Sequence, residues 1–413
     1  MADDKPKNNS NRSFTKRVET KPDGRKLIYY DFAVNESPAG IGTGSNADSD
    51  SGKTVLVTGG AGYIGSVTVK CLIENGIDVV IIDNLSKGHK EAVHPQAKFY
   101  LGDLSDKTFL DHVFSSHKIQ AVIHFAGSIE VGESVLKPEF YHTNNVINGT
   151  NLLQAMKKAG VKDIVFSSTA AVYGNVMVAP ITEDFPLVPN NPYGETKLAF
   201  EKTLATYATD FGFNYLCLRY FNACGADEEL GEAHDPESHL IPNILLAASG
   251  KRDSIKLFGE DYDTDDGTCV RDYIHVKDLA TAHAKALQFL RQAYSQTHSQ
   301  TNSQQSKNVP PNSKAAVRTI NLGTGYGYSV KQVIEAAIKV TKKNIPVEKA
   351  PRRQGDPAKL VAASGLAKEV LNWEPEHSSL EEIIRDAWNW LQAHPNGYKS
   401  TKELSMSKGQ SHV

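Results

Sequence analysis

The sequence predicts an α/β fold built on a doubly wound parallel sheet, and three observations point to it. From residue 54 onward, short runs rich in Val, Ile and Leu alternate with stretches of helical spacing. A glycine-rich turn at residues 59–65 directly follows the first run, and the second run ends in an acid, Asp83. Such alternation indicates βαβ units and a parallel sheet with a crevice at the carboxyl ends of its strands.

The elements are expected in a regular order along the chain. Strands are predicted at residues 54–58, 78–82, 98–101, 121–125, 163–166 and 215–219, and helices at residues 62–75, 110–114, 139–159 and 192–211. The strand runs are short and apolar, whereas the helical stretches place apolar residues three and four apart. After Asn222 the strands become less regular and Pro, Gly and acidic residues more frequent, which indicates a smaller second α/β lobe.

We divide the 413 residues into a Rossmann-type nucleotide-binding domain, a substrate-binding lobe and flexible parts. The polar composition of the first 53 residues predicts a disordered extension, because such a segment cannot bury enough surface to offset its ordering entropy. Within it, residues 27–32 form an apolar island that could dock on the body. The predicted boundaries are 1–53 for the extension, 54–222 for the nucleotide-binding domain, 223–399 for the lobe, 295–315 for a flexible insertion and 400–413 for a polar tail.

Charge and composition exclude several classes of function. The chain has 45 basic and 48 acidic residues, a net charge of −3, so it lacks the basic field of a nucleic-acid-binding protein. No apolar run is long enough to span a membrane. The four cysteines show no zinc-type spacing, so we expect buried thiols in a reducing compartment and no metal site. No targeting signal is recognisable, and the cytoplasm is the expected location.

The glycine-rich turn, with the sequence Thr-Gly-Gly-Ala-Gly-Tyr-Ile-Gly at residues 58–65, predicts a dinucleotide site. Gly59 permits a tight turn, Gly62 lets the backbone approach a pyrophosphate, and Gly65 allows close helix packing. Asp83 is placed to bind the adenosine ribose and to repel a 2′-phosphate, which favours NAD over NADP. The alternatives are a plain tight turn for the glycines and a helix cap for Asp83. Further strand ends place Asp103, Phe125, Ala126 and Gly127 at the same crevice.

A tyrosine and a lysine four residues apart predict a general base. Tyr193 and Lys197 lie near the start of a helix that Asn191 would cap, so they share one helix face. A nearby ammonium and a cationic nicotinamide would lower the pKa of the phenol, whose ordinary value is about 10. The hydroxyl residues at 167–169 end a strand that faces the same crevice, although they could instead cap backbone groups.

Together these motifs resemble the extended short-chain dehydrogenase/reductase family and, within it, the UDP-glucose 4-epimerases. The resemblance runs from about residue 53 to residue 398. It rests on the glycine-rich turn, on Thr169 and on the Tyr193–Lys197 pair. It also rests on the segments Phe-Ala-Gly at 125–127, Val-Gly-Glu-Ser at 131–134, Ser-Thr-Ala-Ala-Val-Tyr-Gly at 168–174, Arg-Tyr-Phe-Asn at 219–222, Gly-Thr-Cys-Val-Arg-Asp-Tyr-Ile-His at 267–275 and Pro-Arg-Arg-Gln-Gly-Asp at 351–356.

The resemblance implies a role for each matching residue. Tyr193 would be the base, Lys197 would hold the nicotinamide ribose and tune Tyr193, and Thr169 would position the sugar hydroxyl. It places NAD against Tyr63, Ile64, Asp83, Asn84, Asp103, Leu104, Asn144 and Tyr220, and a UDP-sugar against Asn222, His239, Leu240, Arg271, Arg353, Asp356 and Leu360. The two arginines suit a diphosphate because of their forked donors.

Three positions depart from the family pattern. Ile129 replaces a lysine found in some members, and His239 replaces an asparagine beside the sugar. Leu360 stands where members restricted to unacetylated sugars carry a tyrosine. Because leucine is smaller, the substitution predicts some activity on UDP-N-acetylglucosamine.

The implied reaction interconverts UDP-glucose and UDP-galactose, as in galactose metabolism. Tyr193 takes the 4-OH proton, the C4 hydride passes to tightly bound NAD, the 4-keto sugar turns over, and the hydride returns to its other face. A 4,6-dehydratase would need Asp-Glu where this chain has Ala170 and Ala171. Open alternatives are a 4-epimerase of UDP-GlcNAc or UDP-xylose and a non-catalytic NAD-binding protein. A homodimer through residues 110–114 and 139–159 is also expected.

Overall fold

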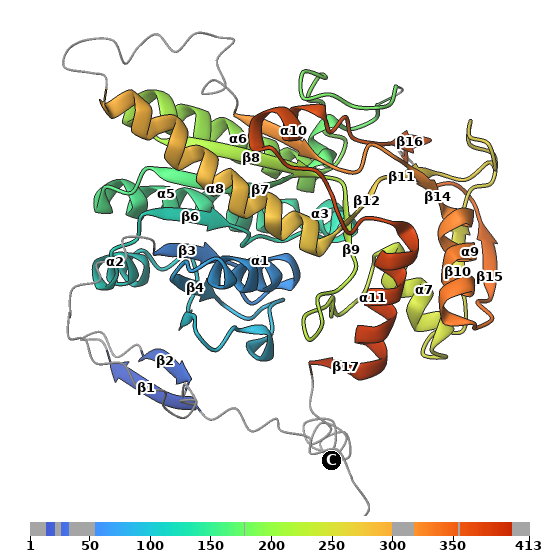
Figure 1. Ribbon diagram of the computed structural model, residues 1–413, viewed down its shortest axis with the longest axis horizontal. Coiled ribbons are helices and arrows are strands. Elements are labelled where there is room, and N and C mark those ends of the chain that lie inside the picture. The colour runs from blue at the N-terminus through green and yellow to red at the C-terminus, as the bar shows by residue number, and fades with distance from the viewer. Residues whose placement is uncertain are drawn as a thin grey trace, which may run out of the picture.

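The computed structural model describes residues 14–20, 26–32, 54–176, 178–299, 318–353 and 356–398. Its centre is a nine-stranded sheet in the order β1-β2-β5-β4-β3-β6-β7-β8-β13 (Figure 1). Seven of these strands are parallel: β3 (Val55–Thr58), β4 (Val79–Asp83), β5 (Lys98–Leu101), β6 (Ala121–His124), β7 (Asp163–Thr169), β8 (Asn214–Tyr220) and β13 (Thr319–Leu322). The strand order reverses between β3 and β6, so the predicted Rossmann-type fold is confirmed.

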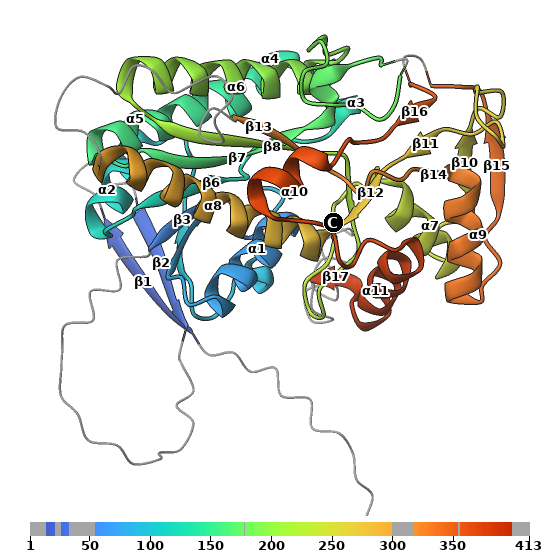
Figure 2. The same ribbon diagram turned by 45° about the horizontal axis from the view of Figure 1, so that its top comes forward.

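Helices cover both faces of the sheet (Figure 2). One layer contains α1 (Tyr63–Glu74), α8 (Val276–Ser299) and α10 (Gly365–Leu371), and the other contains α2 (Lys107–Ser116), α5 (Asn148–Ala159) and α6 (Pro192–Phe211). Along β3, Val55 and Val57 pack in the first layer, whereas Leu56 packs in the second. Because side chains alternate along a strand, an unbroken apolar run fills two cores at once.

The smaller lobe has its own core around three helices. Apolar faces of α7 (Leu240–Ala248), α9 (Val330–Thr341) and α11 (Leu380–Ala393) pack together around Ile244, Val333 and Ile383. Short sheets complete the lobe: β10 (Ile255–Phe258) with β15 (Val347–Ala350), β11 (Val270–Arg271) between β14 (Tyr328–Ser329) and β16 (Lys359–Leu360), and β9 (Asn222–Cys224) with β12 (Tyr273–His275). The last strand is β17 (Pro395–Tyr398).

The division of the chain after Asn222 differs from the prediction. Beyond that point α8, β13 and α10 return to the large sheet, where Leu279, Ile320 and Trp373 pack with Val55 in one core. Residues 223–399 therefore do not form one separate lobe. The pairing of β13 with β8 joins residues about a hundred positions apart, which local sequence patterns do not encode.

The N-terminal extension contains a β-hairpin, so the prediction of a wholly disordered segment is wrong for two stretches. β1 (Phe14–Thr20) pairs with β2 (Lys26–Phe32), and β2 continues the sheet antiparallel to β5, with Ile28 opposite Leu101. The β-prone run Leu-Ile-Tyr-Tyr at 27–30 belongs to the predicted apolar island, and it lies in β2, so the island docks on the sheet as expected. In this position β2 covers β5, the edge strand of the parallel part of the sheet. The other residues of 1–53 lie outside the described part of the chain.

Two further predictions meet the structure only in part. The predicted helix at 139–159 consists of α4 (Pro138–His142), a π-helical turn (Thr143–Ile147) and α5. In the predicted insertion, residues 295–299 continue α8, while residues 300–317 and the polar tail lie outside the described residues. Among the helices described, none is both long and apolar enough to cross a bilayer.

Candidate active site

The turn between β3 and α1 has the shape of an anion site. Gly59 has a φ of +74°, and a Cβ there would stand 2.6 Å from the Ala126 backbone nitrogen. A Cβ on Gly65 would collide with the Gly59 carbonyl oxygen, so both glycines are sterically required. Gly62 is the N-cap of α1, and no side chain caps this helix in the described structure. The first amides of α1 are therefore available to a pyrophosphate.

Two strand ends supply acids beside this turn. The buried Asp83 carboxylate accepts hydrogen bonds from the backbone nitrogens of Ala61 at 3.0 Å and Leu85 at 2.8 Å. Burial raises the pKa of Asp83, and these two hydrogen bonds oppose the rise. Asn84 donates to Asp103 at 2.7 Å. Burial also acts to raise the pKa of Asp103, but hydrogen bonds from Ser105 and Asn84 outweigh it and leave that pKa lowered. The predicted ribose-binding acids are thus brought together next to the glycine turn.

Replacing Asp83 by alanine is expected to weaken NAD binding by about tenfold to a hundredfold, because hydrogen bonds to a charged group contribute about 1.5–3 kcal/mol. The NAD retained after gel filtration, and its dissociation constant, measure the effect. Asp210→Ala, an exposed position at the other end of α6, is the control. Equal NAD retention in the two variants would contradict the assignment.

Tyr193 and Lys197 share one face of α6, as predicted. Asn191 caps this helix by accepting from the Gly194 nitrogen at 2.9 Å. The Lys197 ammonium lies 5.8 Å from the centre of the Tyr193 ring and donates to the Ser167 carbonyl at 2.9 Å. Thr169, at the end of β7, hydrogen-bonds to the Tyr193 side chain. Tyr220 meets this group through a hydrogen bond to the Ser167 hydroxyl.

The pKa of Tyr193 moves against the predicted direction in the protein alone. Burial raises it to about 12, the hydrogen bond from Thr169 lowers it, and the charge of Glu130 raises it further. Burial lowers the pKa of Lys197 to about 8, and the nearby Glu201 opposes that shift. The expected lowering of the Tyr193 pKa is therefore wrong without cofactor, because desolvation outweighs the other influences. A bound nicotinamide cation is the charge that would favour the phenolate.

Small residues at the end of β6 leave room beside Lys197. The backbone nitrogens of Phe125 and Ala126 both donate to the Thr58 carbonyl, which fixes the β6 end against the glycine turn. A Cβ on Gly127 would stand 3.2 Å from Asn145 Oδ1 and 3.7 Å from Lys197 Nζ, so the backbone of Gly127 lies close to both side chains. These residues line the crevice that the strand order predicts.

The π-helical turn adds a residue that sequence reasoning missed. Buried Asn145 accepts from the Ser128 nitrogen at 2.7 Å and donates to the Thr196 hydroxyl at 3.0 Å. Its neighbour Asn144 donates to the Ser128 hydroxyl at 3.0 Å. Asn145 thus joins the loop after β6 to the helix of Tyr193. Two adjacent asparagines inside an apolar helix were the available signal, because asparagine is unfavourable there without a specific partner.

Three of the predicted UDP-sugar residues, Arg271, Asp356 and Leu360, lie close to the pairing of β11 with β16. Arg271 lies opposite Leu360 in register, and its guanidinium stands 3.4 Å from the Asp356 carboxylate. Arg353 is exposed and stacks on the Phe258 ring, with the guanidinium carbon 4.1 Å from the ring centre. Its neighbour Arg352 pairs instead with Asp261 at 2.6 Å. Among the described residues, Arg353 has this ring contact and no ion pair, in contrast to Arg352.

Several predicted site residues have their side chains engaged elsewhere. Leu104 is buried in the core, so only its backbone is available to NAD. Tyr63 donates to the Gly225 carbonyl at 2.7 Å, and Ile64 packs against the α1 core. Asn222 donates to the Asp272 carbonyl at 2.9 Å. His239 caps α7 with its ring held by Glu232 and Glu237, whereas Leu240 begins that helix.

Comparisons with known proteins agree with this geometry. A family model described as the NAD dependent epimerase/dehydratase family matches residues 55–299. The chain belongs to the NAD dependent epimerase/dehydratase family. UDP-glucose 4-epimerase of Halalkalibacterium halodurans is 50% identical over 348 residues, which are 84% of this chain and 98% of that protein.

Solved structures of this family match at similar coverage. UDP-glucose 4-epimerase from Bifidobacterium longum, in complex with NAD⁺ and UDP, has a TM-score of 0.73 and 38% identity over 84% of this chain and 100% of that one. The UDP-Glc/GlcNAc 4-epimerase from Campylobacter jejuni has a TM-score of 0.69 and 39% identity over 83% of this chain and 99% of that one. As a family member, the chain has residues that fit NAD: the uncapped α1 amides, Asp83 and the glycine-lined crevice.

Proposed function

We propose that this chain interconverts UDP-glucose and UDP-galactose by transient oxidation at C4, with NAD held as a bound cofactor. The observation that carries the proposal is the position of Tyr193, Lys197 and Thr169 around one point at the carboxyl end of β7, next to the cofactor crevice. When bound, NAD⁺ accepts the hydride of the sugar C4 and returns it.

The chain's own residues supply proton transfer and positioning. Tyr193 takes the proton of the sugar 4-OH and gives it back after the sugar has turned over. Thr169 hydrogen-bonds to Tyr193 and orients it, and the Ser167 carbonyl holds Lys197, whose ammonium would bind the nicotinamide ribose. Arg271 and Arg353 anchor the diphosphate while the sugar rotates. This chemistry serves galactose metabolism.

The proposal is tested by incubating UDP-galactose with the purified protein and measuring the UDP-glucose formed by chromatography. The absence of Asp-Glu after Thr169 distinguishes it from a 4,6-dehydratase, and production of a 4-keto-6-deoxy sugar would contradict it. A folded, NAD-loaded protein that leaves every UDP-sugar unchanged would support a non-catalytic role instead.

A second substrate, UDP-N-acetylglucosamine, is favoured by Leu360. Leu360 packs against the cluster that contains Ala170 and Val172, one and three residues after Thr169, so it lies on the side of the sugar end of the proposed site. We expect Leu360→Tyr to lower UDP-GlcNAc turnover relative to UDP-glucose by about tenfold or more, since a ring there would fill the space of a 2-acetamido group. Leu360→Ala should keep both activities. If Leu360→Tyr and Leu360→Ala have the same ratio of UDP-GlcNAc to UDP-glucose turnover, residue 360 does not select the sugar. The same assays with UDP-xylose test that alternative substrate.

A homodimer is part of the proposal, and the two predicted faces differ in the apolar surface that they expose. Leu110, Val113 and Phe114 of α2 are buried in the chain's own core. By contrast, apolar side chains are exposed on α3 (Val131–Leu136) and α4, where Leu136 is 81% and Phe140 52% exposed. We propose that this patch, which also includes Val131, Val135 and Ile147, forms the dimer interface.

A charge in this patch should separate the dimer. Phe140→Glu is expected to raise the dissociation constant by about thirtyfold or more, the equivalent of ~2 kcal/mol, because it buries an unpaired carboxylate. Sedimentation equilibrium measures the shift, and Val347→Glu, at an exposed position of β15, is the control. A dimer that is unaffected by Phe140→Glu, or a monomeric wild type, would overturn the interface.

All four cysteines are free thiols. A cytoplasmic location, where thiols stay reduced, therefore completes the proposal.

A further inference from the structure

Four side chains converge on the loop between β9 and α7. The donor atoms of Glu232, His234, Glu237 and His239 all lie within 4.8 Å of one another. His234 Nδ1 and His239 Nδ1 stand 3.0 and 2.8 Å from the same oxygen, Glu232 Oε1. His239 Nδ1 is also 2.9 Å from Glu237 Oε1. A tetrahedral zinc ion with bonds of about 2.0–2.1 Å separates its ligands by roughly 3.3 Å, close to these distances.

The loop directs three of these side chains inward, whereas the His239 side chain is 41% exposed. The side chains of Glu232, His234 and Glu237 are only 7%, 11% and 9% exposed, whereas the residues between them, Asp235, Pro236 and Ser238, are exposed. The spacing of two between Glu232 and His234, and again between Glu237 and His239, places each pair on one side of an extended chain. Cysteine spacing predicts no metal site in this chain, because the ligands proposed at this loop are histidines and glutamates.

Contacts with the rest of the protein fix the loop in place. His89 Nε2 lies 3.0 Å from the Ala233 carbonyl, Lys87 donates to the Asp235 carbonyl at 3.1 Å, and Tyr398 bonds the Gly231 backbone. Ser238 donates to Glu130 at 2.5 Å. A ligand set held by such outer contacts is preorganised, as in structural metal sites.

Glu232 and Glu237 lie close together and have imidazoles as their ion-pair partners among the described residues. In the described part of the chain, the ion-pair partners of Glu232 and Glu237 are His234 and His239, and neither glutamate meets a lysine or an arginine. Buried carboxylates are costly unless they are paired or bind a metal. Either protonated imidazoles or a cation must therefore neutralise the pair.

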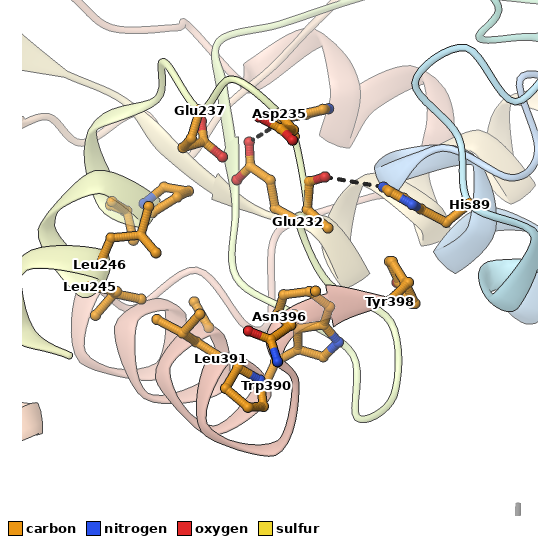
Figure 3. Close-up of a pocket in the computed structure, with 18 of the residues that line it drawn as sticks. His89, Glu232, Asp235, Glu237, Leu245, Leu246, Trp390, Leu391, Asn396 and Tyr398 are labelled. Atoms are coloured by element: carbon orange, nitrogen blue, oxygen red, sulfur yellow. Dashed lines mark hydrogen bonds and ion pairs between the residues drawn. The ribbon is translucent and has the colours of Figure 1, made fainter. Parts of the chain in front are cut away.

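The surroundings favour a cation. Glu232, His234 and Glu237 line a cavity of about 240 Å³. Figure 3 shows Glu232 and Glu237 on one side of it and Trp390 and Leu391 on another. Apolar walls lower the local dielectric constant and so strengthen the attraction of carboxylates for a dication.

We propose that Glu232, His234, Glu237 and His239 bind one divalent transition-metal ion of the zinc class. Two imidazole nitrogens and two carboxylate oxygens form a ligand set that Zn²⁺ accepts. Each histidine binds the metal through an unprotonated Nδ1, so every imidazole that is protonated beforehand releases one proton to solvent, whereas a neutral ring keeps its proton on Nε2. The ion fixes the loop that leads into α7 and Leu240.

Metal titration of the full-length protein tests this site. After dialysis against a chelator, the protein is titrated with Zn²⁺ in a calorimeter, and separately with Co²⁺ while visible absorption is recorded. We expect about one ion per chain, an absorption typical of tetrahedral Co²⁺, and a higher melting temperature with Zn²⁺. Glu232→Gln and His234→Ala should bind at least about a hundredfold more weakly.

His142→Ala, an exposed histidine on α4, is the matched control and should bind like wild type. Binding that is equal in wild type and in either folded loop variant would overturn the proposal. If the variants do not fold, the wild-type protein alone tests the proposal. The absence of both saturable Zn²⁺ binding and a tetrahedral Co²⁺ spectrum in wild type would refute the metal site. Neither readout depends on epimerase activity, so the result is independent of the proposed function.

Discussion

Tyr193→Phe is expected to lower the epimerase turnover number by about 10²–10⁴-fold while the protein stays folded and retains NAD. The phenol is the only group at the β7 end that we assign to take and return the 4-OH proton, and general acid–base catalysis typically contributes a factor of this size. Thr169 remains in place in this variant, so substrate positioning should change little.

The pH profile carries a second part of this prediction. Burial raises the pKa of Tyr193 to about 12 in the protein alone, so the phenol is protonated at pH 7. The rate should therefore rise with pH until it passes the pKa of the cofactor-bound state. We expect that apparent pKa to be well below 12, because the nicotinamide cation favours the phenolate.

Tyr207→Phe, a half-buried tyrosine farther along the same helix, is the matched control and should keep full activity. Turnover numbers and bound NAD are measured for both variants. Turnover of Tyr193→Phe within about threefold of wild type would exclude Tyr193 as the base.

Removing the charge of Glu201 should produce the largest loss of stability, about 3–5 kcal/mol in the free energy of unfolding. Glu201 lies on α6 one turn after Lys197, and its side chain and that of Arg219 are only 7% and 3% exposed. Arg219 donates to Glu201 through Nε at 2.9 Å and through its terminal nitrogen at 2.5 Å. In Glu201→Gln the guanidinium stays buried without its counter-charge.

The same glutamate also joins the catalytic strand to its helix. Ser168, the residue before Thr169, donates to Glu201 at 2.6 Å, and Arg219 donates to Tyr173 at 3.0 Å. Loss of Glu201 should therefore disturb the position of Thr169 relative to Tyr193, and kcat should fall as well as stability.

Urea unfolding measures the stability effect, with an exposed ion pair as the control. Asp111→Asn, which breaks the surface pair with Lys158, should cost at most about 1 kcal/mol. The double variant Glu201→Gln/Arg219→Met should recover part of the loss because no unpaired charge remains. Equal destabilisation by Glu201→Gln and Asp111→Asn would show that the buried pair contributes little.

Local patterns in the sequence predict the cofactor half of the site well. The glycine turn, Asp83 at the end of the second strand, and the Tyr193–Lys197 spacing each depend on residues close together in the chain. The order of strands along the sequence then brings them to one edge of the sheet. These placements, and the parallel sheet itself, agree with the structure.

Features that depend on distant residues could not be read in the same way. Three such features are the pairing of β13 with β8, the pairing of β2 with β5, and the Glu201–Arg219 ion pair. Each joins two segments whose local sequence patterns do not predict that they meet. The raised pKa of Tyr193 in the protein alone also depends on distant residues and is therefore not visible in the local sequence. Its burial depends on the packing of several elements, whereas Lys197 is visible four residues away.

The most direct test of the central claim follows hydrogen at C4 of the sugar. UDP-galactose carrying deuterium at C4 is incubated with the purified protein without added NAD, and the product is analysed by mass spectrometry. The account predicts UDP-glucose that keeps the deuterium at C4, since the hydride leaves and returns within one closed site. Product that has lost deuterium to solvent, or no product from folded, NAD-loaded protein, would contradict it.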